Sequence, residues 1–319
     1  MADFLDKSGL SYCGKEARDI MSKDVYSLDI RNLGITFLPN LKGKEKIHTG
    51  EISDLFQEYS CPFTPEGNAV LGEWYIEPTA IKVNVEACYD EFWNTWLVEQ
   101  TEISLRGGVP ATFADWYFAK FREKMKQEYQ EIWWKGDTEV SSANTHYQYL
   151  KVIDGIEKQL EENSGVTKIS GAVFTVDNIL AQVEAAINSG LGLAADGGWS
   201  TENYKVFMNK NDVRLLKMAL GKVCCPNSES IFSNYAKGPD GGAIIFGFEV
   251  IPTEQSRNTI IFANPKNLVL GFDVFDSHTE YRFIDLRETL GSNQFRVIAI
   301  SNIAAALVWP ETMVYSRVA

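Results

Sequence analysis

The sequence predicts an α+β protein with an N-terminal arm, a long β-hairpin, one long helix and a compact α/β half. Three observations predict this class. Residues 33–86 alternate like strands, residues 112–135 form a long amphipathic helix, and short helices and strands alternate from about residue 150. The chain has 319 residues, of which 45% are hydrophobic, so it can bury a large core without disulfides or metal.

Charge and cysteine usage narrow the class of protein. The 30 Lys and Arg residues against 43 Asp and Glu give a net charge of −13, which opposes gripping the phosphates of nucleic acid. The 5 cysteines are an odd number and form no CxxC pair, and the most apolar stretch, residues 297–309, is too short to cross a bilayer. We therefore expect a soluble protein with free thiols from a reducing compartment, with no membrane partner and no cofactor.

Residues 1–32 are polar and mixed in charge, which is typical of an arm rather than a core element. Residues 33–41 and 69–87 read as two long strands joined by a polar segment that contains proline and glycine, so they predict a protruding hairpin. Its apolar content is too low for a core of its own, and we expect it to pack on another subunit. The basic cluster near its start fits a solvated strand edge, a subunit contact or phosphate binding, and it comprises Lys42, Lys44 and Lys46.

Two helices are predicted next. The first covers residues 89–106 and is rich in aromatic side chains. The second begins with a capping box at Thr112 and Asp115 and ends at Gly136, where we expect a left-handed cap. Its apolar face fits either an ordinary core helix or a lengthwise spine lying on a sheet, and it carries Trp116, Tyr117, Phe121, Met125 and Trp133.

The second half alternates short elements. We expect a helix capped at Thr175 that gives way to a flexible loop at residues 190–195, and a second helix that is capped by Asn209 and stops at Gly221. Single strands are expected in the segments that follow, which are residues 243–251, 258–264, 268–275, 280–286 and 295–300, and in the tail after residue 306.

No catalytic constellation stands out. None of His48, His146 and His278 lies in a metal-binding or nucleophile pattern. The GxGxxA match at residues 190–195 follows a helix instead of a strand, so it does not fit a dinucleotide-binding turn. Asp273 and Asp276 form no complete metal site on their own.

Taken in order, the segments resemble the major capsid proteins of tailed bacteriophages, which have the Hong Kong 97-type capsid fold. The likeness covers nearly the whole chain and rests on residues 75–92, 112–137, 146–156, 175–187, 205–220, 247–273 and 308–318. Residues 224–242 match no motif of the family. No long leader of the kind that some members cleave off is recognised, which leads us to expect a separate scaffolding protein.

The resemblance implies a division of the chain into an N-terminal arm, an extended loop, a peripheral domain that includes the spine helix 112–135, an axial domain and return strands to the peripheral domain. The corresponding ranges are 1–32, 33–86, 87–155, 156–290 and 291–319. Assembly contacts are then expected in the arm and in the extended loop, where the candidate residues are Lys42, Lys44, Lys46, Phe56, Tyr59 and Trp74.

The function that the resemblance implies is structural, not enzymatic. Subunits would join as pentamers and hexamers of an icosahedral shell that encloses double-stranded DNA without sequence-specific binding, with portal and decoration proteins as further partners. Such a shell is assembled in the host cytoplasm and ends as part of the virion. The acidic charge suits a container, because carboxylates repel the packed duplex. Two alternatives are an encapsulin-like nanocompartment and an α/β thiol hydrolase that uses Cys61 or Cys225.

Overall fold

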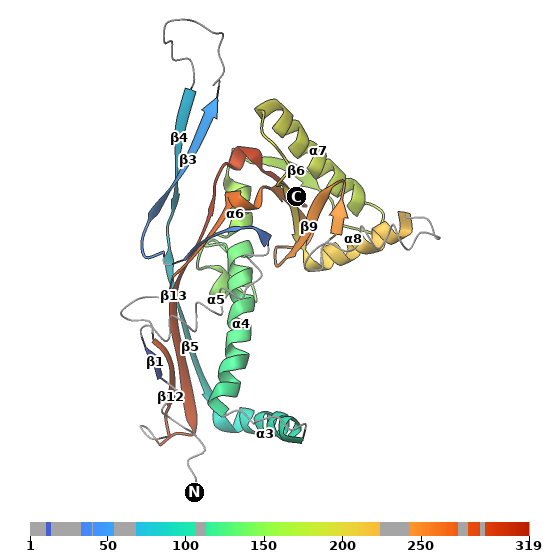
Figure 1. Cartoon of the computed structure of the whole chain (residues 1–319). Helices are drawn as coiled ribbons and strands as arrows, with labels where there is room; N and C mark the ends of the chain where they lie inside the picture. Colours follow the sequence, from blue (N-terminus) through green and yellow to red (C-terminus); the bar gives the residue numbers. More distant parts are fainter. Residues whose placement is uncertain are drawn as a thin grey trace, which may run out of the picture.

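The computed structural model describes residues 11–13, 33–39, 41–53, 68–105, 113–223, 243–273, 280–287 and 291–318. The molecule is elongated, with a hairpin projecting at one end, a long sheet and helix along one side, and an α/β half on the other (Figure 1). The mixed α+β class predicted from the sequence is confirmed.

The first sheet is built on one long strand, β13, which pairs with β5 along one edge and with β11 and β12 along the other. In the part of the chain that the structure describes it has six strands, which are β1 (Ser11–Cys13), β2 (Thr36–Pro39), β5 (Thr79–Cys88), β11 (Leu268–Asp273), β12 (Glu280–Asp285) and β13 (Gln294–Leu307). The strands β1 and β2 are added at the two ends of the order, β1 on β12 and β2 parallel to β11.

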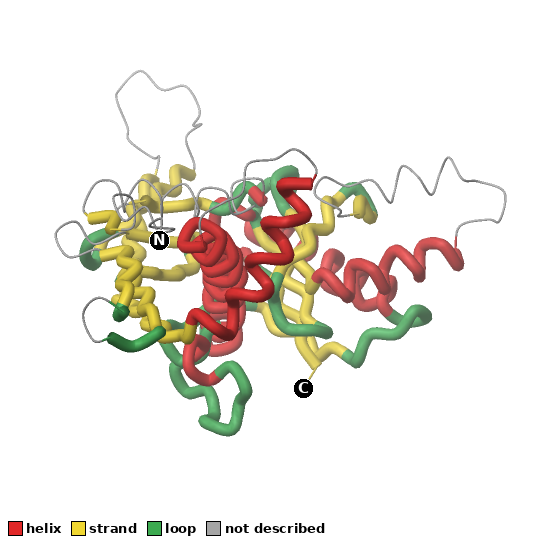
Figure 2. Tube along the Cα trace, turned by 90° about the horizontal axis from the view of Figure 1, so that it is seen from below, coloured by secondary structure: helices red, strands yellow, loops and turns green. Residues whose placement is uncertain are grey.

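Two helices follow β5. α3 (Tyr89–Leu105) starts directly after the strand, and α4 (Phe113–Lys135) runs alongside β5 and β13 (Figure 1). Seen end-on, α4 has the strands of the first sheet on one side (Figure 2). Its aromatic face meets that sheet, since Tyr129 lies edge-on to Phe272 at 5.5 Å and Trp133 edge-on to Phe37 at 6.4 Å. Of the two interpretations of this helix, the spine on a sheet is the one found.

The α/β half contains a second sheet, whose strand order in the described residues is β6-β14-β10-β7-β9-β8. Its strands are β6 (Thr167–Gly171), β7 (Lys205–Asn209), β8 (Ala243–Ile245), β9 (Phe248–Thr253), β10 (Thr259–Ala263) and β14 (Val314–Val318). Two helices, α7 (Ile179–Gly197) and α8 (Lys210–Val223), pack on it through a shared apolar core that includes Val183, Leu216 and Phe262. The other helices in the described part of the chain are α5 (Tyr147–Leu150), α6 (Ile156–Glu162), η3 (Pro265–Asn267) and η4 (Pro310–Thr312).

The hairpin differs from the one predicted. It consists of β3 (Glu45–Ser53) and β4 (Asn68–Ile76), whereas residues 33–41, expected to be its first strand, place β2 beside β11 in the first sheet. The reason is burial, because Ile35 and Leu41 are 6% and 1% exposed and belong to the core of the subunit.

Three further predictions for segments that contain glycine are wrong. The stretch at 190–195 is helical, not a flexible loop, and α7 continues to Gly197 because the ring of Phe262 fills the space beside Gly190, where a Cβ would come within 2.2 Å of it. The expected single strand at 243–251 is a tight hairpin, since Phe246 and Gly247 both have positive φ, at 52° and 84°. Gly136 ends α4 without a left-handed φ, so its role is steric.

Strand pairing also divides the chain differently from the predicted ranges. Within 156–290, β11 and β12 belong to the first sheet. Within 291–319, β14 lies between β6 and β10 in the second sheet instead of returning to the first. The regular part of α7 begins at Ile179, and the turn before it carries a reciprocal capping pattern, because the Asn178 N–H donates to Thr175 Oγ1 at 3.3 Å and the Thr175 N–H donates to Asn178 Oδ1 at 2.7 Å. Thr175 therefore caps this end of the helix, as predicted. The predicted cap at Asn209 is confirmed, because its Oδ1 accepts from the Asn211 N–H at 2.9 Å, although α8 runs two residues past Gly221.

Candidate assembly surface

The β3–β4 hairpin has no core of its own over its projecting part. Leu71 and Tyr75 are 79% and 49% exposed, although both are large apolar side chains. They alternate with Glu73 along β4 and so share one face of the hairpin. The same face also carries Lys46, His48 and Glu73, so Leu71 and Tyr75 are two large apolar side chains exposed on a mixed ribbon, which favours a surface to pack on.

The basic cluster is largely neutralised within the hairpin. Lys46 Nζ lies 2.7 Å from a Glu73 oxygen, and Lys44 Nζ lies 3.3 Å from a Glu77 oxygen. The hydrogen bond with Glu73 raises the pKa of Lys46 and in turn lowers the pKa of Glu73. Both lysines also lie over the ring of Tyr75. This arrangement favours a solvated strand edge over phosphate binding; Lys42 is exposed beside it.

The base of the hairpin is anchored firmly. Leu41 and Ile76 are each 1% exposed and pack with Val269 and Val308 of the subunit body. Trp74, one of the predicted contact residues, instead faces this body, with its ring 6.4 Å from that of Trp309 and its Nε1 donating to Thr49 Oγ1 at 3.2 Å. Phe56 and Tyr59 lie outside the described residues, as does the arm apart from residues 11–13.

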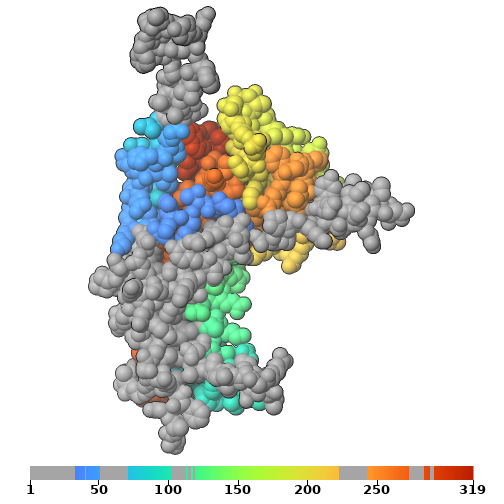
Figure 3. Space-filling view, in the orientation of Figure 1, coloured from blue at the N-terminus to red at the C-terminus, as the bar shows by residue number. Residues whose placement is uncertain are grey.

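A groove of about 350 Å³ separates β3 from the α/β half. It is lined by Gly50 on the hairpin and by Trp199, Trp309 and Glu311 on the body. In Figure 3 the hairpin stands on one side of the red C-terminal segments and α7 on the other. Within the described residues, the hairpin is therefore held at its base, and the groove separates part of β3 from the body.

The spine residues that the sequence singled out lie together under the first sheet. Trp116, Tyr117, Met125 and Trp133 are all less than 10% exposed, and Phe121 is half-buried. The ring of Tyr117 lies 4.6 Å from that of Phe295 on β13. The capping box is not tested, because Thr112 and the side chain of Asp115 lie outside the described residues.

The spine joins the α/β half through close backbone contacts. The Gly155 N–H donates to the Gly136 carbonyl at 2.9 Å, which ties the end of α4 to the start of α6. Two residues further on, the Glu157 carboxylate accepts from the Ser256 N–H of the β9–β10 turn. Glu157 is 6% exposed, and its burial raises the pKa of the carboxyl. These contacts make the junction stiff.

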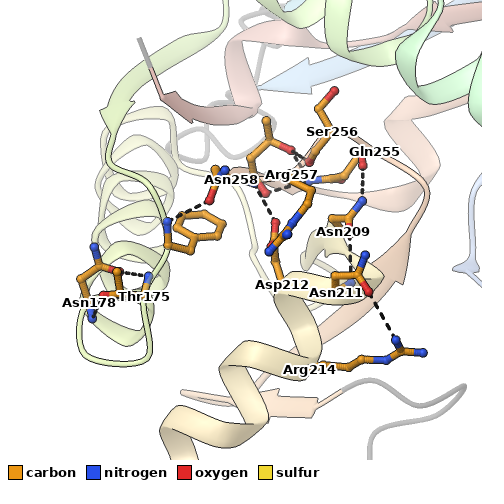
Figure 4. A network of polar contacts seen from close by, with 12 residues as sticks. Thr175, Asn178, Asn209, Asn211, Asp212, Arg214, Gln255, Ser256, Arg257 and Asn258 are labelled. Atoms are coloured by element: carbon orange, nitrogen blue, oxygen red, sulfur yellow. Dashed lines mark hydrogen bonds and ion pairs between the residues drawn. The ribbon is translucent and has the colours of Figure 1, made fainter. Parts of the chain in front are cut away.

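A buried polar network stabilises the turn between β9 and β10 (Figure 4). Asp212, at the start of α8, is fully buried and accepts from the Asn258 N–H at 2.7 Å and from two nitrogens of Arg257 at 3.1 and 3.2 Å. Gln255, also fully buried, donates to the Phe207 and Thr259 carbonyls. Asp212 was not predicted from the sequence, although an acidic residue three positions after the Asn209 cap is a helix-start signal.

Two of the histidines considered for chemistry lie in the described residues, and both are exposed. His48 is exposed on β3 and His146 is exposed before α5, while His278, Cys61, Cys225 and Asp276 lie outside the described residues. Within the described ranges, no three His, Cys, Asp or Glu side chains are grouped as metal ligands. Over the same ranges, no helix has the length and apolar character needed to cross a bilayer.

Comparison with known proteins identifies the class of fold. No protein-family model and no curated protein matches the sequence. A chain of the satellite phage P4 procapsid, which includes the size determination (Sid) protein, matches with a TM-score of 0.62 and covers 98% of this chain and 93% of its own, at 11% identity. The chain has a phage capsid fold.

Two further capsids share this fold at similar distance. The capsid of Myoviridae phage XM1 matches with a TM-score of 0.53 at 11% identity, over 92% of each chain. The capsid of the native GTA particle matches with a TM-score of 0.52 at 9% identity, over 92% of this chain and 90% of its own. The capsid fold therefore takes in both sheets, the hairpin and the long helix, not a single module.

Proposed function

We propose that this protein is the major capsid protein of a tailed phage, which self-assembles through pentamers and hexamers into an icosahedral shell around double-stranded DNA. The observation that carries the proposal is the match of 98% of the chain to a procapsid chain that is itself covered over 93% of its length. A fold shared over nearly the whole chain favours a subunit that does the same structural work and has no enzymatic role.

The shape of the subunit supports this proposal. A closed shell needs contacts in which one surface of a subunit meets a different surface of the next. The projecting hairpin, with Leu71 and Tyr75 exposed, offers one such surface. In this proposal, residues 1–32 and the β3–β4 hairpin clasp neighbours, the α4 spine stiffens the peripheral part, and the α/β half packs around the ring centre.

The charge supports a container more than a DNA-binding protein. At −13, the chain opposes tight contact with phosphates and leaves the packed duplex free to move. The proposed partners are other copies of the chain, a separate scaffolding protein, a portal and decoration proteins, and the proposed location is the virion after assembly in the host cytoplasm.

Electron microscopy of particles formed with the native scaffold, followed by analysis of their contents, tests the proposal. We expect closed shells, and double-stranded DNA inside mature native particles. Particles that hold a packaged enzyme and no DNA would instead favour a nanocompartment. A chain that stays monomeric with its scaffold present would contradict both.

A further inference from the structure

The groove between β3 and the α/β half has the composition of a small-molecule site. Its volume of about 350 Å³ lies within the range of ligand pockets. Three aromatic side chains, Trp199, Tyr204 and Trp309, line it together with Glu311. Among the described residues of the lining, Glu311 is the single charged side chain, and no lysine or arginine is present to neutralise it. The groove therefore combines a negative charge with aromatic surface.

The last turn of α7 adds to this negative character. Gly197, the final residue of the helix, lines the groove, and Asp196 precedes it. The N–H groups of Gly198 and Trp199 both donate to the Ala194 carbonyl, at 2.8 and 3.2 Å, and the later carbonyls of the turn have no partner within the helix. A helix C-terminus carries a partial negative charge that favours a cation, yet the last turn of α7 has no basic residue. A cation that neutralises this end has to come from outside the helix.

Both tryptophans are held in place by the backbone around them. Trp199 follows Gly198, which has a left-handed φ of 73°, and its ring lies so close to Gly197 that a Cβ there would come within 1.6 Å of it. Trp309 has a positive φ of 56°, which is rare for a bulky residue, and its ring lies 6.4 Å from that of Trp74. The aromatic walls are therefore positioned before a ligand binds, which lowers the entropic cost of binding.

This chemistry selects an organic cation. The faces of aromatic rings attract positive charge, and alkylammonium groups are the ligands that aromatic pockets of this kind take. Mg²⁺ and Ca²⁺ fit less well, because they take several oxygen ligands at close range, whereas the lining offers one carboxylate. An alkylammonium ion can place its methylene chain on the rings and its charge beside Glu311.

We propose that this groove binds an organic cation of the alkylammonium class, with its charge between Glu311 and the C-terminus of α7 and its alkyl chain against Trp199 and Trp309. The site lies within one subunit, so the inference goes beyond the proposed shell function and does not depend on assembly. Gly50 of β3 lines the opposite side, so a bound cation lies between the hairpin and the body.

Titration of the full, unassembled chain with putrescine tests the proposal. We expect isothermal titration calorimetry to show one saturable site with a Kd of about 1 mM or tighter, and tryptophan fluorescence to change along the same curve. Mg²⁺ carries the same charge as putrescine, and butanediol has the same carbon chain, and we expect neither to bind there. A chain that shows no saturable binding of putrescine, or from which Mg²⁺ at equal concentration displaces it, would overturn the inference and leave the proposed function standing.

Two variants that remove the same charge locate the site. Glu311→Gln changes an exposed side chain, so the subunit should melt as the parent does, and we expect its affinity for putrescine to fall about tenfold or more. Glu184→Gln is the matched control, because Glu184 is exposed on α7 but does not line the groove, and its affinity should stay within about twofold of the parent. Parent-like affinity in Glu311→Gln, or equal losses in the two variants, would refute the site.

Discussion

The junction between the spine and the α/β half gives the sharpest stability prediction, for Gly136→Ala. A Cβ at this position would lie 2.4 Å from the Ile153 carbonyl oxygen and 2.5 Å from that of Ile132. Both obstacles are backbone atoms, so no change of rotamer relieves the clash. A Cβ at the neighbouring Gly155 would also clash with backbone, because it would lie 2.7 Å from the Gly136 nitrogen.

The magnitude follows from these contacts. Overpacking costs about 1–3 kcal/mol, and loss of the hydrogen bond from Gly155 to the Gly136 carbonyl adds about 1 kcal/mol. We therefore expect Gly136→Ala to lower the free energy of unfolding by about 3 kcal/mol. Urea denaturation of the unassembled subunit, followed by the fluorescence of the adjacent buried Trp133 and Trp134, measures it.

A second glycine provides the control. Gly192 lies inside α7, and a Cβ built there meets nothing within 4 Å. Gly192→Ala should therefore stabilise the subunit by about 1 kcal/mol, through helix propensity alone. A Gly136→Ala variant that loses less than about 0.5 kcal/mol, the range of neutral surface changes, would refute the steric account of the junction.

Three further changes test other parts of the account. Asp212→Ala should lower the free energy of unfolding, measured by urea denaturation, by about 3 kcal/mol, because it removes a buried charged acceptor of several hydrogen bonds. Arg257→Ala should lower it less, because the Arg257 side chain is 59% exposed. Equal losses in the two variants would contradict this ranking. Burial raises the pKa of Glu157 in the folded state, so stability falls as pH rises through that pKa, and Glu157→Gln should gain on the parent from about pH 4 to pH 8; a constant difference across that range would argue against it. Replacing residues 46–75 by Gly-Gly, which joins the paired residues Glu45 and Ile76, should leave a folded subunit by circular dichroism that forms no shells, and normal shells would remove the hairpin from assembly.

The local pattern of apolar residues predicted the helices that bury one face. α3 and α4 were found within a residue of the predicted bounds, because the aromatic stripe of α4 lies on the sheet and carries a clear helical period. The pairing of β12 with β13 also follows from two apolar strands adjacent in the chain.

The pairing of distant strands could not be predicted in the same way. Residues 45–53 carry charge on the projecting ribbon and pack on little in their own subunit, so no alternation identified them as the hairpin strand. Gly190 and Gly192 predicted a break in α7 that the packing of Phe262 overrides. The position of β14 between β6 and β10 depends on long-range register, which a single sequence does not display.

The assembly surface was predicted in outline only. Of the lysine cluster, Lys46 lies on the hairpin strand β3 and Lys44 lies just before it, and their ion pairs with Glu73 and Glu77 required the register of β3 against β4. The exposed pair Leu71 and Tyr75 was missed, because an apolar residue on a strand reads as core until its face is known.

Cryo-electron microscopy of particles assembled from the chain and its native scaffold tests the central claim most directly. We expect closed icosahedral shells of pentamers and hexamers, in which the projecting hairpin of each subunit packs on a neighbour. Particles of another architecture, or only monomers at every concentration, would contradict it.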